Sequence, residues 1–167
     1  MSDALVDVED LFRANYDRLV RVLTAASGDA GDAADAVQEA FVQAYVHWRR
    51  VRTYDDPVAW IRRVALHRVL NARRSRERRA RAVGRLGARA DEVAAPAEAG
   101  DRRVDLSRAL AQLPPRQRAV VALHYFAQLS VQEVADAMGT SAGTVKSQLH
   151  DARRTLGRFF EEVSHER

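Results

Sequence analysis

A group of hydrogen-bond donors lies near the C-terminus of the sequence, at positions that would share one side of a helix. The donors are hydroxyls, an ammonium, an imidazole and two guanidinium groups, carried by Ser141, Thr144, Lys146, Ser147, His150, Arg153 and Arg154. Side chains of these types donate to base edges and hold phosphates in the major groove of DNA. Val145 and Leu149 stand four residues apart within the group, which favours a helix with one apolar side. The pattern predicts a DNA-contacting helix, with an ordinary helical hairpin as the alternative.

The residues before this group predict another helix and a tight turn. Ser130 and Glu133 have the spacing of a capping box, in which each side chain bonds the backbone N–H of the other residue. Gly139 can adopt the positive φ that a tight turn requires, and Ser141 is placed to cap the next helix. Small or apolar side chains are expected to face inward: Val134, Ala135 and Met138. Residues 130–155 therefore predict a helix-turn-helix.

A strongly basic block occupies the middle of the chain. Residues 49–81 carry twelve arginines against three acids, a net charge of +9. Asp56 and Pro57 predict the start of a helix, because proline costs nothing at the first helical position. Such a block binds phosphates or an acidic partner, or it forms a solvated helix face. Trp60 packs in the core or stacks on an unpaired base, and His67 lies on the same face as Trp60.

The N-terminal part has the opposite charge. Residues 1–48 carry nine acids against three arginines, a net charge of −6, and Asp7 is placed to cap the first helix. A second helix has an apolar face formed by Ala33, Val37, Ala40, Phe41, Ala44, Tyr45 and Trp48. On its other face, Asp35, Gln38 and Glu39 suit a polar protein interface, with a solvated face as the alternative. The acids lack the pattern of a calcium loop, so no metal site is expected.

The bulk composition predicts an all-α protein with two small domains. The chain has 167 residues, and alanine supplies much of its hydrophobic fraction of 47%. Alanine adds little buried area, so two small helical cores are expected in place of one large core. Residues 83–101 combine glycine, proline, alanine and charges, which is typical of a flexible linker. No strand pattern of useful length occurs.

Several functional classes find no support in the sequence. The chain has no cysteine, which excludes disulfides, thiolate metal sites and a cysteine nucleophile. No phosphate-binding loop, dinucleotide fingerprint or nucleophile–base pair is present, so we expect neither an enzyme nor a cofactor. No apolar run approaches the roughly 20 residues of a membrane span, and the N-terminus is acidic where a signal peptide is basic. We expect a cytoplasmic protein with no membrane insertion.

Longer motifs in both halves resemble a known family. In the C-terminal half they are ALAQLPPRQRAV at 109–120, YF at 125–126, LS at 129–130, EVA at 133–135 and GTVKS at 143–147. In the N-terminal half they are DAADAVQEAF at 32–41 and DPVAWI at 56–61, with the helix running on to Arg73 and Arg74. Over nearly its whole length, the chain resembles the extracytoplasmic-function group of the sigma-70 family of RNA polymerase sigma factors.

The resemblance implies a division of labour between the two halves. Residues 1–82 resemble region 2, which docks on the β′ clamp of core RNA polymerase and recognises and melts the −10 promoter element. Residues 102–167 resemble region 4, whose helix-turn-helix binds the −35 element and which contacts the β flap. Residues 83–101 would link the two regions. The group also implies promoter DNA as a ligand and an anti-sigma factor as a further partner.

The resemblance also implies roles for single residues. The −35 element is assigned to the donor group that begins at Ser141. The −10 element is assigned to Trp60, Arg63, His67, Asn71 and Arg74, and polymerase docking to Asp35, Gln38, Glu39 and Gln43. His67, Asn71, Gln148 and Asp151 differ from residues common in the family, so no promoter sequence is implied. The alternative function is a stand-alone helix-turn-helix regulator, which would bind duplex DNA alone and start no transcription with core polymerase.

Overall fold

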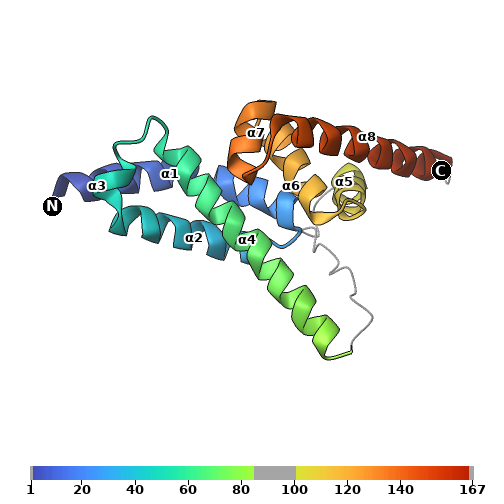
Figure 1. The fold of residues 1–167 in the computed structure, drawn as a ribbon, viewed down its shortest axis with the longest axis horizontal. Helices are drawn as coiled ribbons and strands as arrows, with labels where there is room; N and C mark the ends of the chain where they lie inside the picture. Colours follow the sequence, from blue (N-terminus) through green and yellow to red (C-terminus); the bar gives the residue numbers. More distant parts are fainter. Residues whose placement is uncertain (1, 85–100, 166–167) are drawn as a thin grey trace.

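The computed structural model describes residues 2–84 and 101–165, and within these ranges the chain contains helices and no strand (Figure 1). The elements are α1 (Ser2–Ser27), α2 (Ala30–Val46), α3 (Trp48–Val51), α4 (Pro57–Ala82), α5 (Asp101–Ala111), α6 (Pro115–Val121), the π-helical turn η1 (Ala122–Phe126), α7 (Val131–Met138) and α8 (Ala142–His165). The all-α prediction is confirmed. Most of the predicted linker, residues 85–100, lies outside the described residues.

Helices α1, α2 and α4 form the N-terminal bundle. Helix α1 supplies Leu19, Val22 and Leu23 to its core, and the facing helices supply Val37, Phe41, Ile61 and Leu66. The Asp56 carboxylate accepts a 3.0 Å hydrogen bond from the backbone N–H of Ala59 and caps α4, as predicted. The expected cap at Asp7 is wrong, because α1 already begins at Ser2 and passes through this position.

Helices α5 to α8 form the C-terminal bundle. The capping box of Ser130 and Glu133 is present at the start of α7. Gly139 ends α7 with φ 64° and ψ 40°, the left-handed conformation expected for the turn. Fully buried Val134 and Ala135 of α7 and Val145 of α8 lie in the core, which allows the two helices to pack closely. The predicted helix-turn-helix is confirmed, because the capping box, the left-handed glycine and the buried apolar residues all occur where the sequence predicted them.

The two bundles share one continuous hydrophobic core. Helix α1 runs behind α4 and packs against α6 and η1, and α4 packs against α7 (Figure 1). This differs from the two separate cores expected from the alanine content. The physical reason is that each half buries little apolar area alone, so contact between the halves stabilises both.

Candidate nucleic-acid interface

The predicted donor group lies on the solvent side of α8. All seven of its residues, from Ser141 to Arg154, are exposed. On the opposite side of the helix, Val145, Leu149 and Ala152 are buried in the core. The core contacts of α8 therefore fix its rotation and leave the donors free to approach a DNA groove.

The first turn of α8 is held by two hydroxyls. The Ser141 Oγ accepts a 3.1 Å hydrogen bond from the backbone N–H of Thr144, and lies 2.9 Å from the Thr144 Oγ1. Ser141 therefore acts mainly as the helix cap and orients the Thr144 side chain. Ser147 stands one turn later with an exposed side chain, so its hydroxyl can reach a base edge.

Arg153 is positioned by an aromatic residue that belongs to a quoted motif but to which the sequence assigned no role. Its Nε donates a 2.8 Å hydrogen bond to the hydroxyl of Tyr125, and its guanidinium carbon lies 6.0 Å from the centre of the Tyr125 ring. Tyr125 belongs to η1, where the Ala127 N–H reaches back five residues to the Ala122 carbonyl at 3.1 Å. The contact occupies Nε, so the two terminal nitrogens of Arg153 remain available to an anion.

Helix α4 presents a second exposed row of donors. Arg63, His67, Asn71 and Arg74 are exposed at intervals of four, four and three residues, which places them on one face. Trp60 is half-buried and packs against the core. Its packing agrees with the core alternative, and its exposed part adjoins the row. The structure thus aligns the five residues assigned to the −10 element along one side of α4.

Other arginines of the basic block are bonded to acids. Arg68 pairs with Glu39 of α2 at 3.1 Å, Arg76 pairs with Asp32 of α2, and Arg73 pairs with Glu77 of α4 at 3.0 Å. The net charge of residues 49–81 indicated either phosphates or an acidic partner. Part of that acidic partner is helix α2 of the same chain. The sequence did not predict this pairing, because the residues of the first two pairs are 29 and 44 positions apart.

The residues assigned to polymerase docking lie along α2. Asp35 and Gln38 are exposed, whereas Glu39 and Gln43 are half-buried. Apolar side chains continue the same helix toward its end: Val42, Tyr45 and Val46 are exposed. Tyr45 was expected on the buried face, and this expectation is wrong. The exposed surface of α2 is therefore polar at its start and apolar at its end.

Two charged groups at the contact of α4 with α7 have shifted pKa values. Hydrogen bonds from the backbone and the hydroxyl of Ser130 lower the pKa of the Glu133 carboxyl. Burial lowers the pKa of Arg62 of α4, and the charges of Asp56 and Glu133 partly offset this effect. Both groups keep their ordinary charges at neutral pH, so the contact of α4 with α7 includes an attraction between Arg62 and Glu133.

Two further features of the described residues bear on function. Within residues 2–84 and 101–165, histidines and acids form no cluster of three or more that could hold a metal ion. The helices in these ranges include none that is long and apolar enough to cross a membrane.

Comparison with known proteins gives matches over both halves. A family model described as Sigma-70 region 2 matches residues 11–79, and one described as Sigma-70, region 4 matches residues 103–156. An RNA polymerase sigma-E factor of Streptomyces antibioticus is 33% identical over 160 residues, covering 95% of this chain and 86% of the relative. The ECF RNA polymerase sigma factor SigL of Mycobacterium tuberculosis is 34% identical over 160 residues, covering 92% of this chain and 90% of the relative.

A solved structure has the same fold. It is the sigma factor RpoE of Bartonella quintana, crystallised in complex with the anti-sigma factor NepR. The TM-score is 0.79 at 21% sequence identity, and the match covers 93% of this chain and 97% of that chain.

Proposed function

The chain belongs to the sigma-70 family of RNA polymerase sigma factors, in the extracytoplasmic-function group, and from this premise we propose how its two halves divide the recognition of a promoter. A sigma factor of this group directs core RNA polymerase to promoters and initiates transcription. The chemistry of RNA synthesis belongs to the polymerase, and this chain contributes binding surfaces in the cytoplasm. We propose a region 2 domain at residues 1–82, a linker at 83–101 and a region 4 domain at 102–167.

The solvent side of α8 reads the −35 element. Its exposed cations Lys146, Arg153 and Arg154 hold phosphates, and such contacts supply affinity without sequence preference. Thr144 and Ser147 carry short hydroxyls near the start of the helix, where base edges are usually reached. His150, one turn further along α8, can serve either purpose.

The exposed row of α4 binds the −10 element. Arg63 and Arg74 hold the backbone near the two ends of the row, and His67 and Asn71 face the bases between them. Trp60 offers a half-buried indole ring, on whose exposed part an unpaired base can stack. Stacking of this kind offsets the cost of unpairing, which is a few kcal/mol per base.

The polar part of α2 docks on core polymerase. Asp35 and Gln38 present exposed acceptors, and the exposed apolar residues at the end of α2 extend the same surface. A polar patch beside an apolar one is the composition of a protein interface. An anti-sigma factor is a further partner of the chain, since the sigma factor with the same fold was crystallised with one.

Run-off transcription with purified core polymerase tests the proposal. The observation that carries it is the placement of both assigned donor rows on exposed helix faces, within the two matched regions. The chain plus core polymerase is expected to start transcripts at a defined promoter, and the Asp35→Arg variant is expected to start fewer because its docking is weakened. A stand-alone regulator would bind the duplex by itself and yield no transcript with core enzyme.

A further inference from the structure

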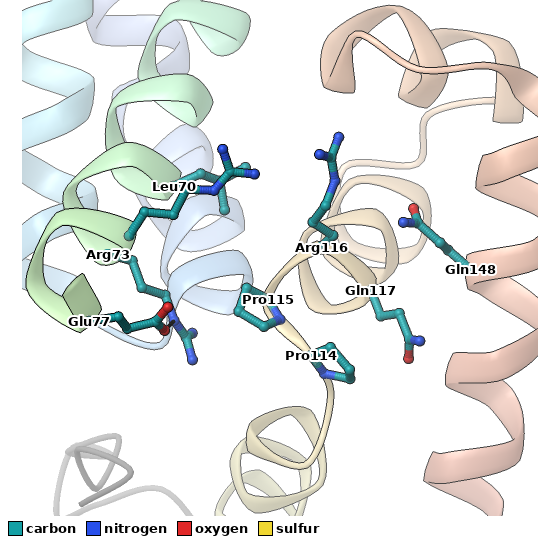
Figure 2. A pocket seen from close by; sticks show the side chains of 9 residues that line it. Leu70, Arg73, Glu77, Pro114, Pro115, Arg116, Gln117 and Gln148 are labelled. Carbon is teal, nitrogen blue, oxygen red and sulfur yellow. Dashed lines mark hydrogen bonds and ion pairs between the residues drawn. The ribbon is translucent and has the colours of Figure 1, made fainter. Parts of the chain in front are cut away.

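A cavity lies between helix α4 and the start of α6, with α8 on its far side. Figure 2 shows Leu70, Arg73 and Glu77 of α4 on one side of it, the start of α6 in the middle, and Gln148 of α8 beyond. The cavity measures about 310 Å³, which lies at the lower end of the range for sites that hold small organic ligands. Its volume is therefore that of a small-molecule site.

The walls of the cavity carry an excess of positive charge. The lining includes one acid, Glu77, and three arginines, Arg73, Arg74 and Arg116. The Arg73 Nε donates a 3.0 Å hydrogen bond to the Glu77 carboxylate, so these two charges largely cancel. Among the described residues, the ion pairs include neither Arg74 of α4 nor Arg116 of α6. Two different elements therefore each bring one unpaired cation to the cavity.

A buried arginine adds positive charge near the same cavity. Arg118 follows Arg116 in α6 and is only 5% exposed. Its Nε donates a 2.8 Å hydrogen bond to the Ala25 carbonyl, and its guanidinium fills space beside Gly28, where a Cβ would lie 2.7 Å from the Arg118 Nη1. Burial, and to a lesser extent the charge of Arg73, lower the pKa of Arg118 to about 10. Arg118 therefore stays charged at neutral pH, and its charge favours an anion in the cavity.

Two glutamines supply neutral hydrogen-bonding groups to the lining. Gln117 of α6 and Gln148 of α8 both line the cavity, and their Oε1 atoms are buried without a hydrogen-bond partner within the described part of the chain. A buried acceptor without a donor is unfavourable. The last torsion of a glutamine side chain is soft, so either amide can turn its oxygen toward a ligand. Such oxygens accept hydrogen bonds from hydroxyl groups, which favours a ligand that carries hydroxyls beside its charged group.

The two unpaired arginines select the charged group of the ligand. Guanidinium groups form paired, charge-assisted hydrogen bonds with phosphate and carboxylate oxygens. A phosphate monoester has three free oxygens and a charge of about −1.5 to −2 at neutral pH, so it can bond to two guanidinium groups and balance both. A carboxylate has two oxygens and one charge, and would leave one arginine uncompensated. The charge and number of the donors therefore favour a phosphate monoester.

We propose that this cavity binds a small phosphate monoester, whose phosphate group is held between Arg74 and Arg116 and whose hydroxyl groups bond to the two glutamines. Arg74 and Arg116 are also exposed to solvent, so the ligand can enter from the surface. The site goes beyond the proposed function, because Arg116 and the glutamines belong to neither donor row assigned to DNA. Arg74 does belong to the −10 row, so a bound ligand occupies one arginine of that row.

Titration of the free, full-length chain tests the site. Inorganic phosphate and ribose 5-phosphate are added separately to the isotope-labelled chain at constant ionic strength, and NMR follows the glutamine amide and arginine Nε–H signals. Both probes are expected to show saturable binding at millimolar concentrations or below. Ribose 5-phosphate is expected to bind more tightly, because its hydroxyls add hydrogen bonds. Absence of saturable binding by both probes would overturn the site, and equal affinity for the two would overturn the role of the glutamines.

Three substitutions of charged residues locate the bound phosphate. Arg116→Gln removes one of its two proposed partners and is expected to weaken binding at least roughly tenfold. Glu77→Gln removes the acid of the lining and is expected to strengthen binding, because a repulsive charge is lost. The matched control is Arg78→Gln, which makes the same change of charge at an exposed residue of α4 outside the cavity. It is expected to change the affinity less than about twofold, because exposed charges are screened by salt.

The control also defines the contrary result. Equal weakening by Arg116→Gln and Arg78→Gln would show that phosphate collects on the basic surface in general, and would overturn the cavity as its site.

A singly charged probe distinguishes a small monoester from the backbone of a nucleic acid. Dimethyl phosphate is a diester with one negative charge, like each phosphate of DNA. It is expected to bind several-fold more weakly than inorganic phosphate, because it balances only one of the two arginines. Binding as tight as that of inorganic phosphate would indicate a contact for nucleic acid and would overturn the monoester.

The outcomes are independent of the proposed function. The titrations contain neither DNA nor polymerase, so a chain that starts no transcript with core enzyme can still bind phosphate in the cavity. A chain that binds no phosphate can still start transcripts, and then only the ligand site is overturned.

Discussion

Helices α4 and α8 both present basic side chains, yet these side chains are held in different ways. In α4, three arginines pair with acids, two of them on α2. Within the described part of α8, no cation forms an ion pair. Arg153 instead donates a hydrogen bond to the hydroxyl of Tyr125. The net charge of a segment therefore does not measure its capacity to bind DNA. In α4, part of the positive charge holds the helices of the bundle together, and that part is not available to a ligand.

The largest effect is expected from the exposed row of α4. Arg63→Glu combined with Arg74→Glu should lower promoter-dependent transcription on the order of 100-fold, because two attractive charges become repulsive toward phosphate. The matched control is Arg68→Glu combined with Arg76→Glu, which reverses the same number of charges at two arginines that face Glu39 and Asp32 on α2. Run-off assays at fixed salt compare the two variants. Equal losses would mean that the paired and unpaired arginines of α4 do not differ in function.

Next in size is the contrast between two residue types on α8. Ser147→Ala should change the preference among −35 sequences by about 1–3 kcal/mol at one base pair, with little change in salt dependence. Arg154→Ala should weaken binding to all sequences and reduce the salt slope by about one unit. Binding of holoenzyme to promoter variants at several salt concentrations measures both. The opposite pattern, with Arg154→Ala altering base preference, would reverse the assignment of roles along α8.

A smaller effect is expected at Tyr125. Tyr125→Phe keeps the ring under Arg153 and removes the hydroxyl that accepts from its Nε. The loss of this hydrogen bond, worth about 0.5–1.5 kcal/mol, should reduce promoter affinity only a few-fold. Arg153→Ala alone and combined with Tyr125→Phe completes the comparison. If Tyr125 acts by positioning Arg153, the tyrosine substitution has no further effect once the arginine is gone.

The smallest effect concerns the ion pair of Arg68 and Glu39. Their side chains are 41% and 46% exposed, and exposed pairs of this kind contribute about 0.2–1 kcal/mol to stability. A double-mutant cycle with alanine at both positions, followed by urea unfolding, should give a coupling energy in that range. A coupling of several kcal/mol would show that α2 and α4 depend on this pair far more than its exposure suggests.

The sequence predicted the local elements best where a short-range signal decides them. The Asp56 cap, the Ser130–Glu133 capping box and the Gly139 turn each depend on residues within four positions, and all three are present. The prediction of a cap at Asp7 was wrong because α1 begins earlier, at Ser2. An acid near the expected start of a helix is also compatible with a helix that begins before it. The prediction that Tyr45 is buried was wrong. Helical periodicity places Tyr45 on the apolar face of α2, but it does not say how far along that face a neighbouring helix extends.

The long-range features could not be found in the same way. Arg118 lies within an arginine-rich chain, and nothing near it in sequence marks it as buried. Its partner Ala25 is 93 positions away. The residue assignments to promoter elements and polymerase stay predictions, and the structure adds to them the exposure of each assigned side chain and the identity of its neighbours.

The separation between Arg118 and Ala25 also has a consequence for synthesis of the chain. A ribosome adds about 5–20 residues per second, and domains fold from the N-terminal side first. The 93 residues between the two partners therefore take roughly 5–20 s to make. During that interval α1, α2 and α4 can assemble while the surface of α1 that later meets α6 remains hydrated. A nascent chain that stops before Arg118 would carry a complete N-terminal bundle with the space beside Gly28 filled by water.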